Sequence, residues 1–323
     1  MIPLLLSIQL ISSQLSADRT DYDGKTLTFT GKFELSHPLG TIYAEKATLE
    51  NLQMHPRTSS KTFPLSLENG VKIISFQEEP PISISADHAL SEIPALFTLT
   101  ELQEARFFKD VEIKIFSKDP VTARGGSALY TSGSMTLYPS LPKISCQLLQ
   151  EDNRIDAAEM SFHFKNQEVH CQKPKGIFPR HALEFSAQTL QWKKGHLKLN
   201  GSVTLKQSEL FVEAERGELI CSDQLDPKLM ILEGDVRLVS SRIQDKLSFA
   251  AADRVVFDPI EKTLVFSSSA PKKVLFWQEG LFLSANQVRV DTKKESIQGD
   301  GDVHFTFNPE EKNYIEELFS KYL

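Results

Sequence analysis

The segment Leu197-Lys198-Leu199-Asn200-Gly201-Ser202-Val203-Thr204-Leu205 sets the architecture of this chain, because it recurs in altered form along the sequence. An earlier copy reads Leu27-Thr28-Phe29-Thr30-Gly31-Lys32-Phe33-Glu34-Leu35. Each copy follows a short segment that begins with Ala and ends in a polar turn, at residues 17–25 and 187–195. A β unit repeated in this way predicts an architecture built by stacking, with one long face along which function is expected.

Further copies of the unit differ in detail. One contains Gly234 within residues 230–238, and another contains Gly299 and Gly301 within residues 297–305. The segments fall roughly 30 to 40 residues apart, which is within the range of stacked repeats. The Ala residues that open the other segments, the last four of them in weaker copies, are Ala214, Ala252, Ala285, Ala44, Ala86, Ala123 and Ala158.

Apolar residues alternate with polar ones between the turns, which is typical of a β-strand with one dry and one wet face. The sequence therefore predicts an all-β fold of stacked antiparallel strands, with the dry positions on one continuous face. These dry positions are Leu27, Phe29, Phe33, Leu35, Leu197, Leu199, Val203, Leu205, Val236, Leu238, Val303 and Phe305.

The composition and net charge indicate which classes of binding partner are expected. The chain has 323 residues, a net charge of −7 and 40% apolar residues. A nucleic-acid partner is not expected, because proteins that bind polyanions usually carry a basic patch. The slightly low apolar content suits an elongated body with much surface.

The two ends of the chain differ from the repeats between them. Residues 2–11 are almost wholly apolar and lead to small residues before Ala17, so we predict a signal peptide over residues 1–17 and export. The apolar run is shorter than the roughly 20 residues of a membrane-spanning helix. Residues 309–323 predict a short C-terminal helix, with Pro309 as its first residue and an apolar stripe through Tyr314 and Leu318. It is interpreted as a cap on the last layer or, alternatively, as a docking helix.

A seam at Pro139 and Pro142 divides the repeats into a first segment, 18–142, and a second, 143–308, which we expect to be continuous with the first. Neither segment contains a recognisable arrangement of catalytic residues. His163, His170 and Cys171 lack the spacing of metal ligands, so no metal or cofactor is expected. The three cysteines are read as buried free thiols, with a Cys146–Cys171 disulfide as the alternative.

The opening copy also resembles a known family. Ala17-Asp18-Arg19-Thr20-Asp21-Tyr22-Asp23-Gly24 through Gly31, with the later segments Glu233-Gly234-Asp235-Val236 and Ala252-Asp253-Arg254-Val255, resembles the OstA/LptA family of lipopolysaccharide-transport proteins. That family is related to LptC and to the N-terminal domain of LptD. The resemblance is clearest at residues 17–50 and 185–307, and Phe33 stands where Val is usual.

The resemblance implies a folded-over β-jellyroll, or β-taco, with an apolar furrow. It implies a non-enzymatic periplasmic protein of outer-membrane biogenesis that carries lipopolysaccharide or a lipid A-like glycolipid. Partners implied in the same way are inner-membrane LptC-like and outer-membrane LptD-like proteins, joined by edge-strand addition, and further copies of the chain associated head to tail.

Elementary physical chemistry agrees with this hypothesis. Each buried methylene contributes about 0.8 kcal/mol, so acyl chains need shelter from water, which an apolar furrow between sheet faces provides. The dry positions named above are the predicted furrow. Two alternatives remain: a structural β-solenoid scaffold with a filled core, and a carbohydrate-active β-helix enzyme.

Overall fold

The computed structural model describes residues 14–38, 40–50, 62–76, 80–94, 104–131, 133–140, 145–207, 210–222, 227–243, 246–278 and 280–307. Nearly all of these residues form antiparallel strands, which confirms the predicted all-β class. Their only helical turns are the 3-10 segments Phe164–Asn166 and Pro179–His181. The predicted helix at 309–323 and the first thirteen residues of the predicted signal peptide lie outside the described residues.

The chain forms two compact units, each treated separately here. Unit 1 ends at Gln150 and also contains Ser161–Asn166, and unit 2 holds Glu151–Met160 and the residues from Gln167 onward. The seam predicted at Pro139 and Pro142 lies within the residues assigned to unit 1. Strand β12 (Glu159–His163) lies across this boundary.

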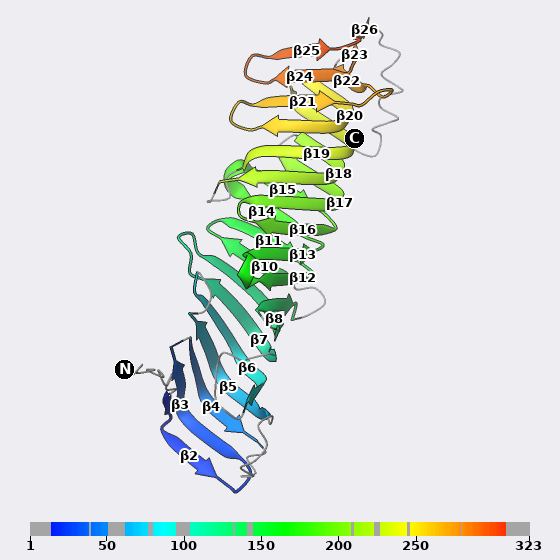
Figure 1. Ribbon diagram of the computed structural model, residues 1–323. Coiled ribbons are helices and arrows are strands. Elements are labelled where there is room, and N and C mark those ends of the chain that lie inside the picture. The colour runs from blue at the N-terminus through cyan, green and yellow to red at the C-terminus, as the bar shows by residue number, and fades with distance from the viewer. Residues whose placement is uncertain are drawn as a thin grey trace, which may run out of the picture. The chain divides into compact units, whose positions relative to one another are not determined.

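In unit 1, long strands pair with one another in sequence order, and short strands pair with the ends of the outermost ones (Figure 1). Both β1 and β2 pair with β3, and both β9 and β10 pair with β8. The long strands are β3 (Leu27–His37), β4 (Gly40–Leu49), β5 (Thr62–Ser75), β6 (Ile82–Pro94), β7 (Glu104–Ile115) and β8 (Val121–Thr131). The short strands are β1 (Gln14–Ser16), β2 (Arg19–Tyr22), β9 (Ser134–Tyr138) and β10 (Cys146–Gln150).

Unit 2 is built in the same way around β17 (His196–Gln207), β18 (Leu210–Cys221), β19 (Pro227–Ile243) and β20 (Lys246–Asp258). In Figure 1 these green and yellow strands are the longest of the unit, and shorter strands continue the stack beyond them. The shorter strands pair with one end or the other of β17 and β20, so that two half-sheets share the long strands.

The short strands define the half-sheets, and each half-sheet also includes the adjoining ends of the long strands. Half-sheet A contains β13 (Glu168–Gln172), β16 (Thr189–Lys193), β21 (Thr263–Ser267), β24 (Gln287–Asp291) and β25 (Ser296–Asp300). Half-sheet B contains β11 (Asn153–Ala157), β14 (Lys175–Phe178), β15 (Leu183–Ser186), β22 (Val274–Gln278), β23 (Leu281–Ala285) and β26 (His304–Phe307).

The long strands of unit 2 bend where two consecutive residues adopt the left-handed conformation. In β17 these are Gly201 and Ser202, with φ of 75° and 48°, and in β19 they are Gly234 and Asp235, with φ of 81° and 43°. The pairing register shifts at both sites, between Asn200 and Val203 and between Glu233 and Val236. A two-against-one bulge of this kind bends a strand, which lets one strand belong to both half-sheets. We call the line of bends the crease.

Unit 1 has a crease of the same construction. Left-handed pairs occur at Gly31-Lys32, Asn69-Gly70 and Lys109-Asp110, each at a register shift. The recurring Gly of the sequence is thereby explained, because glycine adopts positive φ at no steric cost. Lys109-Asp110 shows that the bend does not require glycine.

The recurring Ala is explained by the intervening strands. Ala44, Ala86, Ala214 and Ala252 are buried at the crease, and each is followed by an acidic residue opposite a left-handed pair. Ala123 does not fit this pattern, because it pairs with Ile113 and lies away from the crease. In β8 the residue opposite the left-handed pair Lys109-Asp110 is Gly126 rather than an acidic residue. In the weak copy assigned to Ala158, the buried residue is the preceding Ala157, and Ala158 itself is exposed.

The geometry of the crease predicts how much stability is lost when Gly234 is replaced by alanine. A Cβ there would lie 2.8 Å from the Cβ of Glu215, at a φ that disfavours side chains. We expect Gly234→Ala to lower the free energy of unfolding by about 2–3 kcal/mol in urea titrations. Gly280→Ala is the matched control, since Gly280 has φ of 85° but nothing within 4 Å, and we expect about 1 kcal/mol. Equal costs for both variants would contradict the crease argument.

Candidate functional site

The interior of each unit is the space that the bent strands enclose, and the predicted dry positions point into it. Leu197, Leu199, Val203 and Leu205 of β17 are all buried, whereas Lys198, Asn200 and Lys206 between and beyond them are exposed. The same alternation holds in β3 of unit 1, where Phe29, Phe33 and Leu35 are buried and Leu27 is half-buried. Val236 and Leu238 of β19 are buried in the same way.

Val303 and Phe305 behave differently from the other predicted residues. Their side chains are 37% and 55% exposed, although both continue the interior face. A Cβ at Gly299 of half-sheet A would lie 3.2 Å from Val303 Cγ1, which places Val303 on the inner side. In the described residues, β26 pairs with β23 alone. Val303 and Phe305 are therefore the interior-facing side chains that are exposed in the last described layer of unit 2.

The register connects interior residues of which only Leu197 was selected from the sequence. On half-sheet A, an unbroken cross-strand row of apolar side chains runs through nine strands. Its members are Val169, Trp192, Leu197, Leu219, Met230, Phe257, Leu264, Val290 and Ile297. The alternation within each strand carried the signal for them, but their alignment depends on register, which the sequence does not show.

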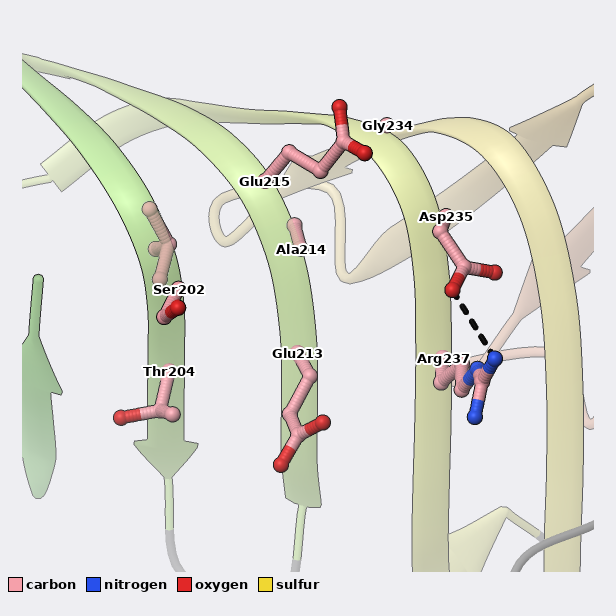
Figure 2. Close-up of a pocket in the computed structure, with 9 residues that line it drawn as sticks. Ser202, Thr204, Glu213, Ala214, Glu215, Gly234, Asp235 and Arg237 are labelled. Atoms are coloured by element: carbon pink, nitrogen blue, oxygen red, sulfur yellow. Dashed lines mark hydrogen bonds and ion pairs between the residues drawn. The ribbon is translucent and has the colours of Figure 1, made fainter.

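A separate, polar pocket of 390 Å³ lies on the outer face at the crease of unit 2. Figure 2 shows Ser202 and Thr204 on one strand, Glu213 and Glu215 on the next, and Asp235 with Arg237 on the third. Arg237 donates a 2.9 Å hydrogen bond to Asp235. The pocket therefore combines carboxylates, hydroxyls and one guanidinium, which suits small polar ligands rather than acyl chains.

The crease of unit 2 also carries an ion pair between Asp253 and Lys272. Asp253 accepts a backbone hydrogen bond from Ser269 and a 3.1 Å hydrogen bond from Lys272 Nζ. These two contacts hold the pKa of the Asp253 carboxyl below its ordinary value of 3.8. Asp253 raises the pKa of Lys272 in return, with smaller effects from Asp235 and Glu215.

The residues considered for metal chemistry are placed apart by the structure. His163 contacts Ser134 and His170 contacts Glu168, while the Cys171 side chain is buried in the interior. In the described part of the chain, no group of three or more His, Cys, Asp or Glu residues is arranged to hold a metal ion. Cys146, Cys171 and Cys221 are buried and form no disulfide, as the free-thiol reading predicted.

Within the described residues, no helix is long and apolar enough to cross a bilayer.

Comparisons with known proteins give partial similarity to solved structures. No family model matches the chain, and no curated protein matches it. A matching solved structure is that of LptH, the LptA-homologous periplasmic component of the lipopolysaccharide transport device from Pseudomonas aeruginosa. The two chains are 11% identical, the match covers 40% of this chain and 97% of LptH, and the TM-score is 0.36.

The Asp253 contacts predict a pH-dependent contribution to stability. Because the folded pKa lies below the unfolded one, the carboxylate stabilises the fold above about pH 4, and this is lost as pH falls through the folded pKa. We expect Asp253→Asn to lower the Tm by about 1–3 °C at pH 7, and the difference from the parent chain to shrink progressively as the pH falls below about 4. The exposed Glu50→Gln is the control. A difference that persists unchanged at pH 3 would contradict this account.

Proposed function

We propose that this protein binds lipopolysaccharide or a lipid A-like glycolipid and passes it across the periplasm toward the outer membrane, without catalysing a reaction. The observation that carries the proposal is the apolar interior of unit 2, whose last described layer exposes Phe305. The repeated unit, with its resemblance to the OstA/LptA family, supports the same function.

The interior is filled by side chains in this structure, so a lipid enters only if the half-sheets separate. In unit 2 the half-sheets are continuous through β17, β18, β19 and β20 at the crease, which makes the crease a natural hinge. Acyl chains that replace the lost side-chain contacts keep the apolar surfaces out of water, at about 25 cal/mol per Å². Separation in the presence of lipid therefore costs far less than separation in water.

Partners are proposed to join at the edge strands. β26 of unit 2 pairs on one side only in the described residues, and an unpaired strand edge accepts a further strand from another chain. Inner-membrane LptC-like proteins, outer-membrane LptD-like proteins and further copies of this chain are the proposed partners. Export by the signal peptide at residues 1–17 is part of this proposal.

The filled-core scaffold remains the strongest alternative, because Leu197, Leu199 and Leu238 are completely buried. The carbohydrate-active enzyme is favoured only by the carboxylates Glu213, Glu215 and Asp235 in the outer pocket. The two alternatives differ from lipid transfer in where a ligand binds: nowhere in the interior for the scaffold, and at the outer crease for the enzyme.

Site-specific photo-cross-linking tests the proposal. We place p-benzoylphenylalanine at Phe305, which is exposed on the interior face, and at Ile260, which is 64% exposed in a turn, and add lipopolysaccharide. Adducts are expected at position 305 and not at 260. Both sites are exposed, so neither replacement disturbs the core. Folded protein without adducts at position 305 would favour the filled-core scaffold.

A charge at the same place gives an independent test. We expect Phe305→Asp to weaken lipopolysaccharide binding on the order of tenfold, because a carboxylate beside an acyl chain must be desolvated. Ile260→Asp, with the same chemical change at an exposed site, is expected to leave the dissociation constant unchanged. Equal effects of the two variants, measured by fluorescence titration, would contradict an interior site.

A further inference from the structure

The two outer margins of the unit 2 interior differ in chemistry. On half-sheet A the outermost interior row is the apolar row described above, which we call the apolar lip. On half-sheet B the corresponding row also follows from the register, and we call it the polar lip. The polar lip consists of Phe178, Leu183, Gln207, Leu210, Ser240, Ser248, Gln278 and Leu281, and it includes Asn153, which precedes the Arg154–Ile177 pair in β11.

Amides and hydroxyls of the polar lip face the interior rather than the solvent. Ser240, Ser248, Gln278 and Asn153 are all buried. One row further toward the crease the interior becomes apolar, with Leu205, Leu238 and Phe276 in the same strands. The lip therefore places hydrogen-bonding groups, interspersed with apolar side chains, along the margin of a hydrophobic interior.

Some of this hydrogen-bonding capacity is used within the chain. Gln278 Nε2 donates a 3.0 Å hydrogen bond to Ser248 Oγ, and Gln207 Nε2 donates a 3.1 Å bond to the His181 carbonyl. The Asn153 side chain is 6% exposed, and its Oδ1 atom accepts no hydrogen bond. A buried acceptor without a donor is destabilising, so a ligand group that donates an N–H or O–H to this atom would bind favourably.

The chemistry of the row selects the ligand group. The polar lip contains amides and hydroxyls but no Lys, Arg, Asp or Glu, so a phosphate would be buried there without a counter-charge. Neutral groups that both donate and accept hydrogen bonds suit Asn, Gln and Ser side chains. In a glycolipid, these groups are the amides, esters and hydroxyls where acyl chains join the sugar.

We propose that the polar lip binds the amide, ester and hydroxyl groups at the junction of acyl chain and sugar, while the chains lie in the apolar rows behind it. The inference rests on the proposed function, because it assumes acyl chains in the interior. It adds that half-sheet B faces the headgroup side of the lipid, and that recognition there is by neutral hydrogen bonds.

Two probes with equal chains separate this inference from the proposed function. N-(3-hydroxytetradecanoyl)glucosamine carries an amide and a hydroxyl on its chain near the sugar, whereas the chain of tetradecyl glucoside is joined through a glycosidic oxygen and carries neither group. Both are titrated below their micellar concentrations against the full chain, against Asn153→Leu and against the double variant Ser248→Ala/Gln278→Leu. The double variant removes both partners of one hydrogen bond, which limits its effect on stability. Gln298→Leu, an amide on the outer side of β25, is the matched control.

The expected result is a loss of affinity for the hydroxyacyl probe by about five- to tenfold in Asn153→Leu and in the double variant. Affinity for tetradecyl glucoside is expected to stay unchanged, as is the Gln298→Leu control with both probes. If both probes bind and the lip variants weaken both equally or neither, the polar lip is not a recognition site, although the proposed function stands. If neither probe binds the folded parent chain, the proposed function itself is overturned. The Tm of each variant verifies folding, and Asn153→Leu is expected to keep the parent Tm or exceed it, since it removes an unpaired buried acceptor.

Discussion

A strand can belong to two facing sheets only if it bends, and in this chain paired left-handed residues make the bend. Gly201-Ser202 and Gly234-Asp235 turn β17 and β19 from one half-sheet to the other. The bulge leaves β17 and β19 with one more residue than β18 and β20 have at the crease. The interior, its two margins and the outer pocket are all positioned by this geometry.

In the intervening strands β18 and β20, the alternation of buried and exposed residues is interrupted at the crease. Between buried Ala214 and Gly217, both Glu215 and Arg216 point outward, and Ala252, Asp253, Arg254 and Val255 repeat the pattern. Arg216 and Arg254 both lie near Glu233, next to the bend of β19. The Ala–acid–base sequence thus marks the crease: the Ala is buried, and the two polar residues after it lie on the outer side, where the strand changes direction.

Much of this architecture could be predicted from particular residues. Alternation at Leu197, Leu199, Val203 and Leu205 predicted the buried face, and the recurring Gly and Ala predicted equivalent positions in stacked units. The bend itself was not predicted, because a Gly between two strands fits a turn as well as a bulge. The lips were missed for another reason: Ser248 and Gln278 are far apart in sequence, and only the register brings them together.

Sharing strands between the half-sheets also determines how unit 2 gains its stability. Neither half-sheet can form alone without leaving the other half of β17 to β20 unpaired, so we expect the two half-sheets to fold cooperatively across the crease. Along the stack each strand pairs only with its neighbours, which makes cooperativity in that direction local, as in other repeat proteins. Amide exchange should then be slowest at β18 and β19 and become faster toward β26, one layer at a time. The exposed Phe305 lies in the layer that such fraying would release first.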